Sequence, residues 1–93
     1  MKSGEDLCVI AIIENQRGLH ARAAAKFVKL AESFSADIFV TKDDMRVSAR
    51  SIMGLMMLAA TKGSTIHISG SGTDAATELQ TMSEFVKRKF DEE

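Results

Sequence analysis

The stretch RGLHARAAAKF, residues 17–27, decides how this chain begins to fold. It opens with a glycine–leucine pair, and after the histidine that follows the apolar side chains recur at helical spacing. The stripe that they form consists of Ala24, Phe27, Val28, Ala31 and Phe34. It predicts an amphipathic helix of about four turns. Packing accounts for the stripe, but it explains neither Gly18 nor His20 nor Arg22 at the start of the helix.

Four short segments around this helix predict β-strands. Residues 7–13 form a continuous apolar run, which is typical of a buried strand. Residues 36–41 and 45–48 flank the polar turn KDDM and predict an antiparallel pair. In residues 64–69 apolar and polar side chains alternate, so the two isoleucines face the core and His67 faces solvent.

Two further helices follow from local signals. Residues 52–57 predict a short apolar helix with Ser51 as its N-cap. After the turn SGSG, Thr73 can cap a last helix, and Asp74 suits the positive end of that helix. The buried stripe of this helix would be Ala75, Leu79, Met82 and Val86. The order is therefore βαββαβα, and the expected fold class is α+β: an open-faced β-sandwich with a four-stranded antiparallel sheet and three helices on one face.

The composition predicts a single folded domain that spans residues 1–93. Apolar residues make up 45% of the chain and charged residues 27%, which argues against disorder. A net charge of −1 gives no basic excess for binding nucleic acid or a membrane surface. No apolar run approaches the roughly 20 residues of a membrane span. The start MKSGEDL lacks the layout of a signal peptide, so the cytoplasm is the expected location.

Cysteine and histidine are too few for a metal or redox centre. Cys8 is the only cysteine, and its apolar surroundings predict a buried structural thiol. With no second cysteine, His20 and His67 are a poor ligand set, so we expect no metal. His67 has no helix start or arginine beside it in the sequence, which argues against a second phosphate site. Residues 62–65, KGST, lack the glycine spacing of a P-loop.

His20 and Arg22 point to phosphoryl chemistry because they stand where a helix begins. The first backbone N–H groups of a helix have no internal partner, and the helix dipole makes that end positive, so an anion can bind there. A neutral imidazole at the first helical position is a nucleophile near neutral pH. An arginine two residues further on can receive phosphate oxygens. The alternative is a solvated histidine or a cap, and on residue types alone that alternative is the commoner case.

Two motifs carry a resemblance to a known family. GLHAR, residues 18–22, is followed by AAKFV, and SIMGLM stands at residues 51–56. In both motifs, in length and in the βαββαβα order, the chain resembles the HPr family, the histidine phosphocarriers of the bacterial phosphotransferase system. The resemblance runs from about Leu7 to Phe90.

The resemblance implies a role for each site residue. His20 would carry a phosphoryl group on its Nδ1 atom, and Arg22 would stabilise the phosphohistidine. Enzyme I would be the phosphoryl donor, and an enzyme IIA-type protein the acceptor. Ser51 matches the serine that HPr kinase/phosphorylase phosphorylates for regulation. Such a relay protein is not a turnover enzyme, and no cofactor is expected.

One departure from the family bears on the pathway. The commonest family form has proline where this chain has Ala23, and alanine leaves an extra free N–H near the phosphate and a looser helix start. The form HARA together with MGLMMLAA looks more like the regulatory, nitrogen-related branch than the sugar-transport branch. Both branches, and therefore the identity of the acceptor, stay open.

The helix expected at residues 52–57 carries more apolar side chains than one face can bury. We expect some of them to form a flexible docking patch beside His20, since methionine suits a surface that fits several partners. The patch consists of Ile52, Met53, Met56 and Met57. The patch lies beside His20 only if the two helices lie with their N-termini together, as the resemblance implies. The alternative is a wholly buried helix.

Ser51 has two interpretations. As an N-cap it stabilises the helix by roughly 1 kcal/mol and needs no regulatory role. As a phosphoserine it would place negative charge at the rim of the docking patch and weaken docking to an acidic partner.

The function expected from the sequence is therefore a phosphoryl relay. The alternative is a regulatory docking module whose phosphorylation state controls partner proteins rather than sugar uptake. A stand-alone enzyme lacks support, because the sequence shows no acid/base pair and no cofactor motif. We expect a monomer that binds neither nucleic acid nor membrane.

Overall fold

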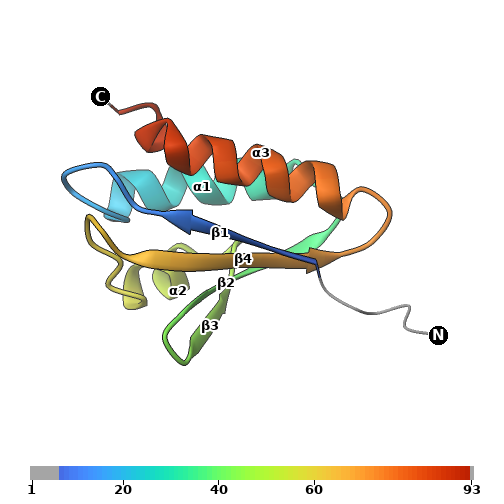
Figure 1. Ribbon diagram of the computed structural model, residues 1–93, viewed down its shortest axis with the longest axis horizontal. Helices are drawn as coiled ribbons and strands as arrows, with labels where there is room; N and C mark the ends of the chain where they lie inside the picture. The colour runs from blue at the N-terminus through green and yellow to red at the C-terminus, as the bar shows by residue number, and fades with distance from the viewer. Residues whose placement is uncertain (1–6, 93) are drawn as a thin grey trace.

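The computed structural model describes residues 7–92, in which a four-stranded sheet carries helices on one face (Figure 1). In chain order the elements are β1 (Leu7–Ile12), α1 (Ala21–Glu32), β2 (Asp37–Lys42), β3 (Met45–Ser48), α2 (Ile52–Met57), β4 (Thr65–Ser71), α3 (Ala75–Lys87) and the 3₁₀ turn η1 (Lys89–Asp91). The predicted βαββαβα order and the α+β open-faced sandwich are thus confirmed. Within the described residues no helix combines the length and the apolar character that crossing a membrane requires.

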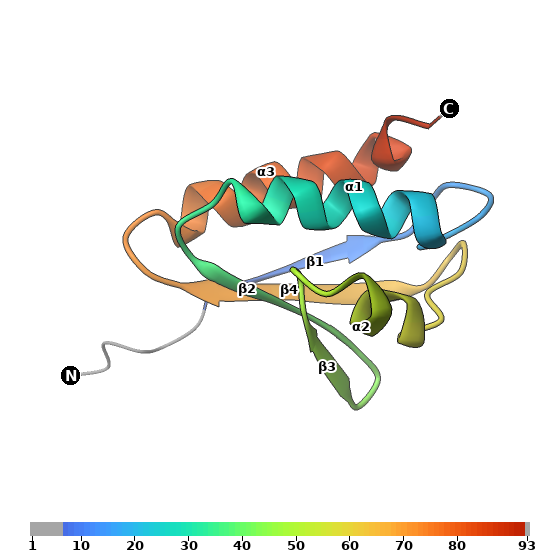
Figure 2. The ribbon, with the colours of Figure 1, turned by 180° about the vertical axis from the view of Figure 1, so that it is seen from behind.

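The sheet has the strand order β1-β4-β2-β3, and every neighbouring pair is antiparallel. The central strand β4 pairs with β1 on one side and with β2 on the other, while β3 forms a hairpin with β2. In both views α1 and α3 lie side by side over one face of the sheet (Figures 1 and 2). The core lies between these helices and the sheet, and the opposite face stays open.

The apolar stripes place the two long helices as their spacing predicts. All four residues predicted for the last helix are buried: Ala75, Leu79, Met82 and Val86. In α1 the stripe is buried up to Ala31, whereas Phe34 lies beyond the end of the helix at Glu32 and is only partly buried. The predicted cap at Thr73 is wrong. The N-cap position belongs to Asp74, and its side chain makes no capping hydrogen bond.

The prediction that residues 7–13 form a buried strand with a buried Cys8 is also wrong. Because β1 lies at the edge of the sheet, only alternate side chains reach the core, and Ala11 and Ile13 do so. Cys8 is exposed on the open face, and Ile10 is 61% exposed there. His67 lies on the same face of β4, as predicted, and its Nδ1 atom is 4.0 Å from the Cys8 sulfur.

The turn η1 folds the end of the chain back onto the helices. Phe90 is fully buried, in edge-to-face contact with Phe27 and Phe85. The backbone reaches this position through three consecutive left-handed residues, Lys89, Phe90 and Asp91, with φ of 59°, 56° and 57°. Each such non-glycine residue costs on the order of 1 kcal/mol, which the burial of an aromatic ring can offset. The turn delivers the next residue, Glu92, to the start of α1.

Candidate functional site

Gly18 fixes the loop that leads into α1. Its φ is +64°, and a Cβ atom added there would lie 2.4 Å from the backbone oxygen of Ala60. The next residue, Leu19, donates its N–H to that same oxygen at 2.9 Å. Only glycine combines the left-handed conformation with so close a backbone contact. The loop is thereby held against the segment that follows α2.

His20 is the N-cap residue of α1, one position before the first helical residue, Ala21, whereas the sequence placed it at the first helical position itself. Its backbone is extended, and its carbonyl accepts the first helical hydrogen bond from Ala24 at 2.8 Å. The His20 side chain makes no capping hydrogen bond to the backbone of this helix. The N–H groups of Ala21, Arg22 and Ala23 lack intrahelical partners, and free N–H groups at the start of a helix favour an anion.

The imidazole of His20 meets a carboxylate that the sequence does not suggest. Nε2 lies 2.9 Å from Oε1 and 2.8 Å from Oε2 of Glu92, and both side chains are mostly buried, with 17% and 11% exposure. A carboxylate only accepts hydrogen bonds, so in this arrangement the ring proton resides on Nε2. The lone pair of the neutral ring is then on Nδ1. Both hydrogen bonds that the described residues make to this ring involve Nε2.

Asn15 ties the loop to the carboxylate. Its side chain is fully buried, and Nδ2 donates to the backbone oxygen of Gly18 at 2.8 Å and to Oε1 of Glu92 at 3.3 Å. Its Oδ1 atom has no hydrogen-bond partner among residues 7–92. The amide thus positions Glu92 through a group that cannot itself take a charge.

Opposing effects act on the pKa of Glu92. Burial raises this pKa, but the hydrogen bond and the charge of His20 lower it, with further lowering from Lys26 and Asn15. The net pKa lies below the ordinary value of a glutamic acid. Glu92 is therefore an anion at neutral pH and can stabilise positive charge on the imidazole ring.

Arg22 lies in the first turn of α1 and is exposed. Across the described part of the chain, no hydrogen bond or ion pair joins its guanidinium to His20. The structure therefore brings Arg22 to the correct end of the helix, and its role toward a phosphoryl group stays a prediction.

The patch predicted on α2 is exposed. The side chains of Ile52, Met53, Met56 and Met57 are all exposed, with Met53 the most open at 73%, while Leu55 is buried. Ser51 is the predicted N-cap: its Oγ accepts the N–H of Gly54 at 3.0 Å. Gly54 also permits close packing, since an added Cβ would lie 3.0 Å from Cβ of Val47.

The orientation of α2 differs from the expectation. Leu19, the residue before His20, bonds to Ala60, which lies just beyond the C-terminal end of α2. Figure 2 shows the start of α1 and the end of α2 at the same end of the molecule. The expectation that the two N-termini lie together is therefore wrong, and Ser51 lies at the end of α2 away from this loop.

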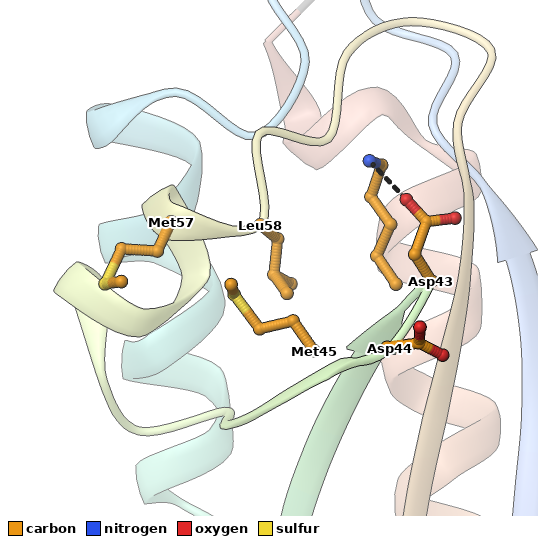
Figure 3. Close-up of a pocket in the computed structure, with 6 residues that line it drawn as sticks. Asp43, Asp44, Met45, Met57 and Leu58 are labelled. Atoms are coloured by element: carbon orange, nitrogen blue, oxygen red, sulfur yellow. Dashed lines mark hydrogen bonds and ion pairs between the residues drawn. The ribbon is translucent and has the colours of Figure 1, made fainter.

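A shallow hollow extends the exposed patch toward the β2–β3 hairpin (Figure 3). It has a volume of about 440 Å³, and Met45, Met57 and Leu58 line its apolar side. Asp43 and Asp44 form its acidic side, where Asp43 pairs with Lys42 at 3.2 Å. The apolar surface of α2 therefore continues onto the hairpin, which the sequence did not indicate.

Comparison with known proteins identifies the family. Residues 9–88 match the family model described as "PTS HPr component phosphorylation site". The phosphocarrier protein HPr of Neisseria meningitidis is 45% identical over 80 residues, which are 86% of this chain and 90% of that protein. The phosphocarrier protein NPr of Shewanella violacea is 44% identical over 78 residues, which are 84% of this chain and 86% of that protein.

Solved structures agree with this assignment. A crystal structure of HPr-C-His from Thermoanaerobacter tengcongensis has a TM-score of 0.88 at 40% sequence identity, and the match covers 94% of this chain and 98% of that one. The region matched by the family model contains the whole of α1 and α2, with the histidine and serine that precede them. The chain belongs to the HPr family, the phosphocarrier proteins of the phosphotransferase system.

Proposed function

We propose that this phosphocarrier accepts a phosphoryl group on Nδ1 of His20 from phosphorylated enzyme I and passes it to an enzyme IIA-type acceptor. The observation that carries the proposal is the pair of hydrogen bonds that Nε2 of His20 donates to the two carboxylate oxygens of Glu92. They hold the ring proton on Nε2, so that Nδ1 keeps the lone pair that a nucleophile needs.

The transfer step follows from this arrangement. The Nδ1 lone pair forms a bond to phosphorus while the bond between phosphorus and the donor breaks, and that electron pair returns to the donor. Nε2 keeps its proton, so the ring gains positive charge, which the Glu92 carboxylate stabilises. The free N–H groups at the start of α1 and the Arg22 guanidinium receive the phosphoryl oxygens. Attack by the acceptor reverses these changes, and no proton has to leave the site.

The exposed patch on α2 is proposed as the docking surface for these partners. Its methionine side chains are flexible and apolar, and they lie on the element that adjoins the loop before His20. Ser51 begins that element, so a phosphate on its hydroxyl would add nearly two negative charges at one end of the patch. HPr kinase/phosphorylase is the candidate enzyme for this modification.

A regulatory docking function is the second candidate. The observation that favours it is the 44% identity to a protein named NPr, which accords with the nitrogen-related form of the HARA motif. In that case the phosphorylation state of His20 would control partner proteins rather than sugar uptake. Either function is proposed for a monomer.

The relay is tested with enzyme I and phosphoenolpyruvate. The wild-type chain should acquire one acid-labile phosphate, and His20→Ala should acquire none. His67→Ala is the matched control, since this second histidine lies on the open face of the sheet and should leave labelling unchanged. Labelling of His20→Ala would disprove the assignment. Passage of the phosphate to a purified IIA-type protein then separates the relay from a pure docking module.

A further inference from the structure

A second hollow lies between α1 and α3, and neither the relay nor the docking patch uses it. It has a volume of about 560 Å³, within the range typical of small-molecule pockets. The charged and large apolar residues that line it are Lys26, Lys29, Leu30, Phe85, Arg88 and Asp91. Leu30 and Phe85 supply apolar surface, and the other four residues are charged.

The charges around this hollow favour an anion. Three cationic side chains and one carboxylate, that of Asp91, line the hollow. This carboxylate is already paired with Arg88, whose Nε lies 2.9 Å from Oδ1 of Asp91. None of the described residues pairs with Lys29. The Arg88 guanidinium also lies 5.5 Å from the centre of the Phe85 ring, so positive charge and an aromatic surface meet at one place.

We propose that this hollow binds a small amphipathic anion, namely a phosphate monoester or carboxylate that carries an apolar group about the size of one aromatic ring. The apolar group would lie against Leu30 and Phe85, and the anionic group would bind Lys29 together with Lys26 or Arg88. The occupant is identified by charge complementarity combined with the apolar surface.

The hollow shares residues with the contacts that hold η1 in place. The Lys26 ammonium donates to the backbone oxygen of Phe90 at 3.3 Å, and Phe85 packs edge-to-face on the Phe90 ring. The turn η1 also positions Glu92 for its contact with His20. An anion that draws Lys26 away from Phe90 would therefore loosen the Glu92–His20 contact and slow phosphoryl transfer. This coupling rests on the proposed function of His20, whereas binding to the hollow does not.

Binding is tested by titrating phenyl phosphate into the ¹⁵N-labelled, unphosphorylated protein and following amide chemical shifts. Saturable shifts should appear in residues 26–33 and 81–91. Inorganic phosphate, which lacks the ring, and benzyl alcohol, which lacks the charge, should both bind more weakly. Lys29→Gln should weaken phenyl phosphate binding by up to about fivefold, as loss of one exposed ion pair does. Lys62→Gln, an exposed lysine that does not line the hollow, is the control and should bind normally.

The outcomes separate binding from coupling. Shifts that grow linearly without saturation, or that centre on residues 21–24, would overturn the proposed site. His20→Ala should bind phenyl phosphate at least as tightly as the wild type, because it lacks the contact that binding would loosen, so a failure of the relay leaves this result intact. If the hollow is saturated and the rate of labelling by enzyme I is unchanged, the coupling through Lys26 is refuted.

Discussion

Replacing Glu92 by glutamine tests whether its carboxylate selects the reactive nitrogen of His20. The side chain keeps its size and one hydrogen-bond acceptor, but it loses the negative charge that lies 2.8 Å from Nε2. Glutamine can also donate an N–H to the ring, which the carboxylate cannot do. Both neutral tautomers then become available, and in one of them a proton occupies Nδ1 and blocks the attack on phosphorus.

The expected size of the effect follows from the change in the hydrogen bond. A neutral hydrogen bond contributes about 1 kcal/mol net, and a charge-assisted one is about twice as strong. The substitution therefore removes about 1 kcal/mol of stabilisation from the positively charged ring in the transition state, which corresponds to roughly fivefold slower transfer.

The lowered pKa of Glu92 adds a pH dependence to this prediction. A carboxyl group whose pKa is lower in the folded state contributes stability above its unfolded pKa, and that contribution is lost as the pH falls through the folded value. The wild type should therefore lose stability in acid, below the ordinary glutamic acid pKa of 4.5, more steeply than Glu92→Gln. The two proteins should differ most near neutral pH.

Three measurements decide the matter: initial rates of phosphorylation by enzyme I, the ¹⁵N shifts of the His20 ring, and urea denaturation from acid to neutral pH. Asp91→Asn is the matched control, because its carboxylate bonds Arg88 rather than His20. If Glu92→Gln is phosphorylated at the wild-type rate and its ring keeps the proton on Nε2, Glu92 does not position the nucleophile.

Three further predictions follow from the geometry. Gly18→Ala should destabilise the fold by more than about 1 kcal/mol in urea denaturation, because of its positive φ and the contact with Ala60; an unchanged midpoint would contradict the close approach. Arg22→Ala should leave the melting temperature nearly unchanged and slow the transfer, since an exposed charge contributes little to folding; lost stability with normal transfer would reverse these roles. Ser51→Asp and Met53→Glu should both keep a normal circular dichroism spectrum, and aspartate is itself a good N-cap. Both variants should be phosphorylated more slowly by enzyme I, because each adds negative charge at the patch. Wild-type rates in both variants would show that docking takes place elsewhere.

Local periodicity predicted most of the fold. The helical stripes of α1 and α3, the hairpin around Asp43 and the outward His67 all depend on neighbouring residues, and each is present. The position of a strand within the sheet is a property of the whole chain. The apolar run of β1 therefore could not reveal that Cys8 lies at an edge and faces outward.

The candidate site likewise contains residues that the sequence predicts and residues that it does not. GLHAR placed His20 and Arg22 at a helix start from sequence alone. Glu92 contacts His20 although 72 positions separate them in the sequence. The contact depends on a left-handed turn that the residue types in that segment do not predict. Asn15 stood in a polar loop segment, where an asparagine near a glycine usually indicates only a turn. Contacts between residues so far apart in the sequence depend on how the core packs, and they leave no periodic pattern in the sequence.

The antiparallel arrangement of α1 and α2 determines how a phosphate on Ser51 can act. Six helical residues separate Ser51 from the end of α2 that adjoins the loop before His20, which is a span of about 9 Å. At physiological ionic strength electrostatic screening acts over about 8 Å, so the charge of that phosphate is largely screened at the far end of α2. The modification should therefore raise the KM for enzyme I and leave kcat nearly unaltered, and added salt should remove much of the inhibition.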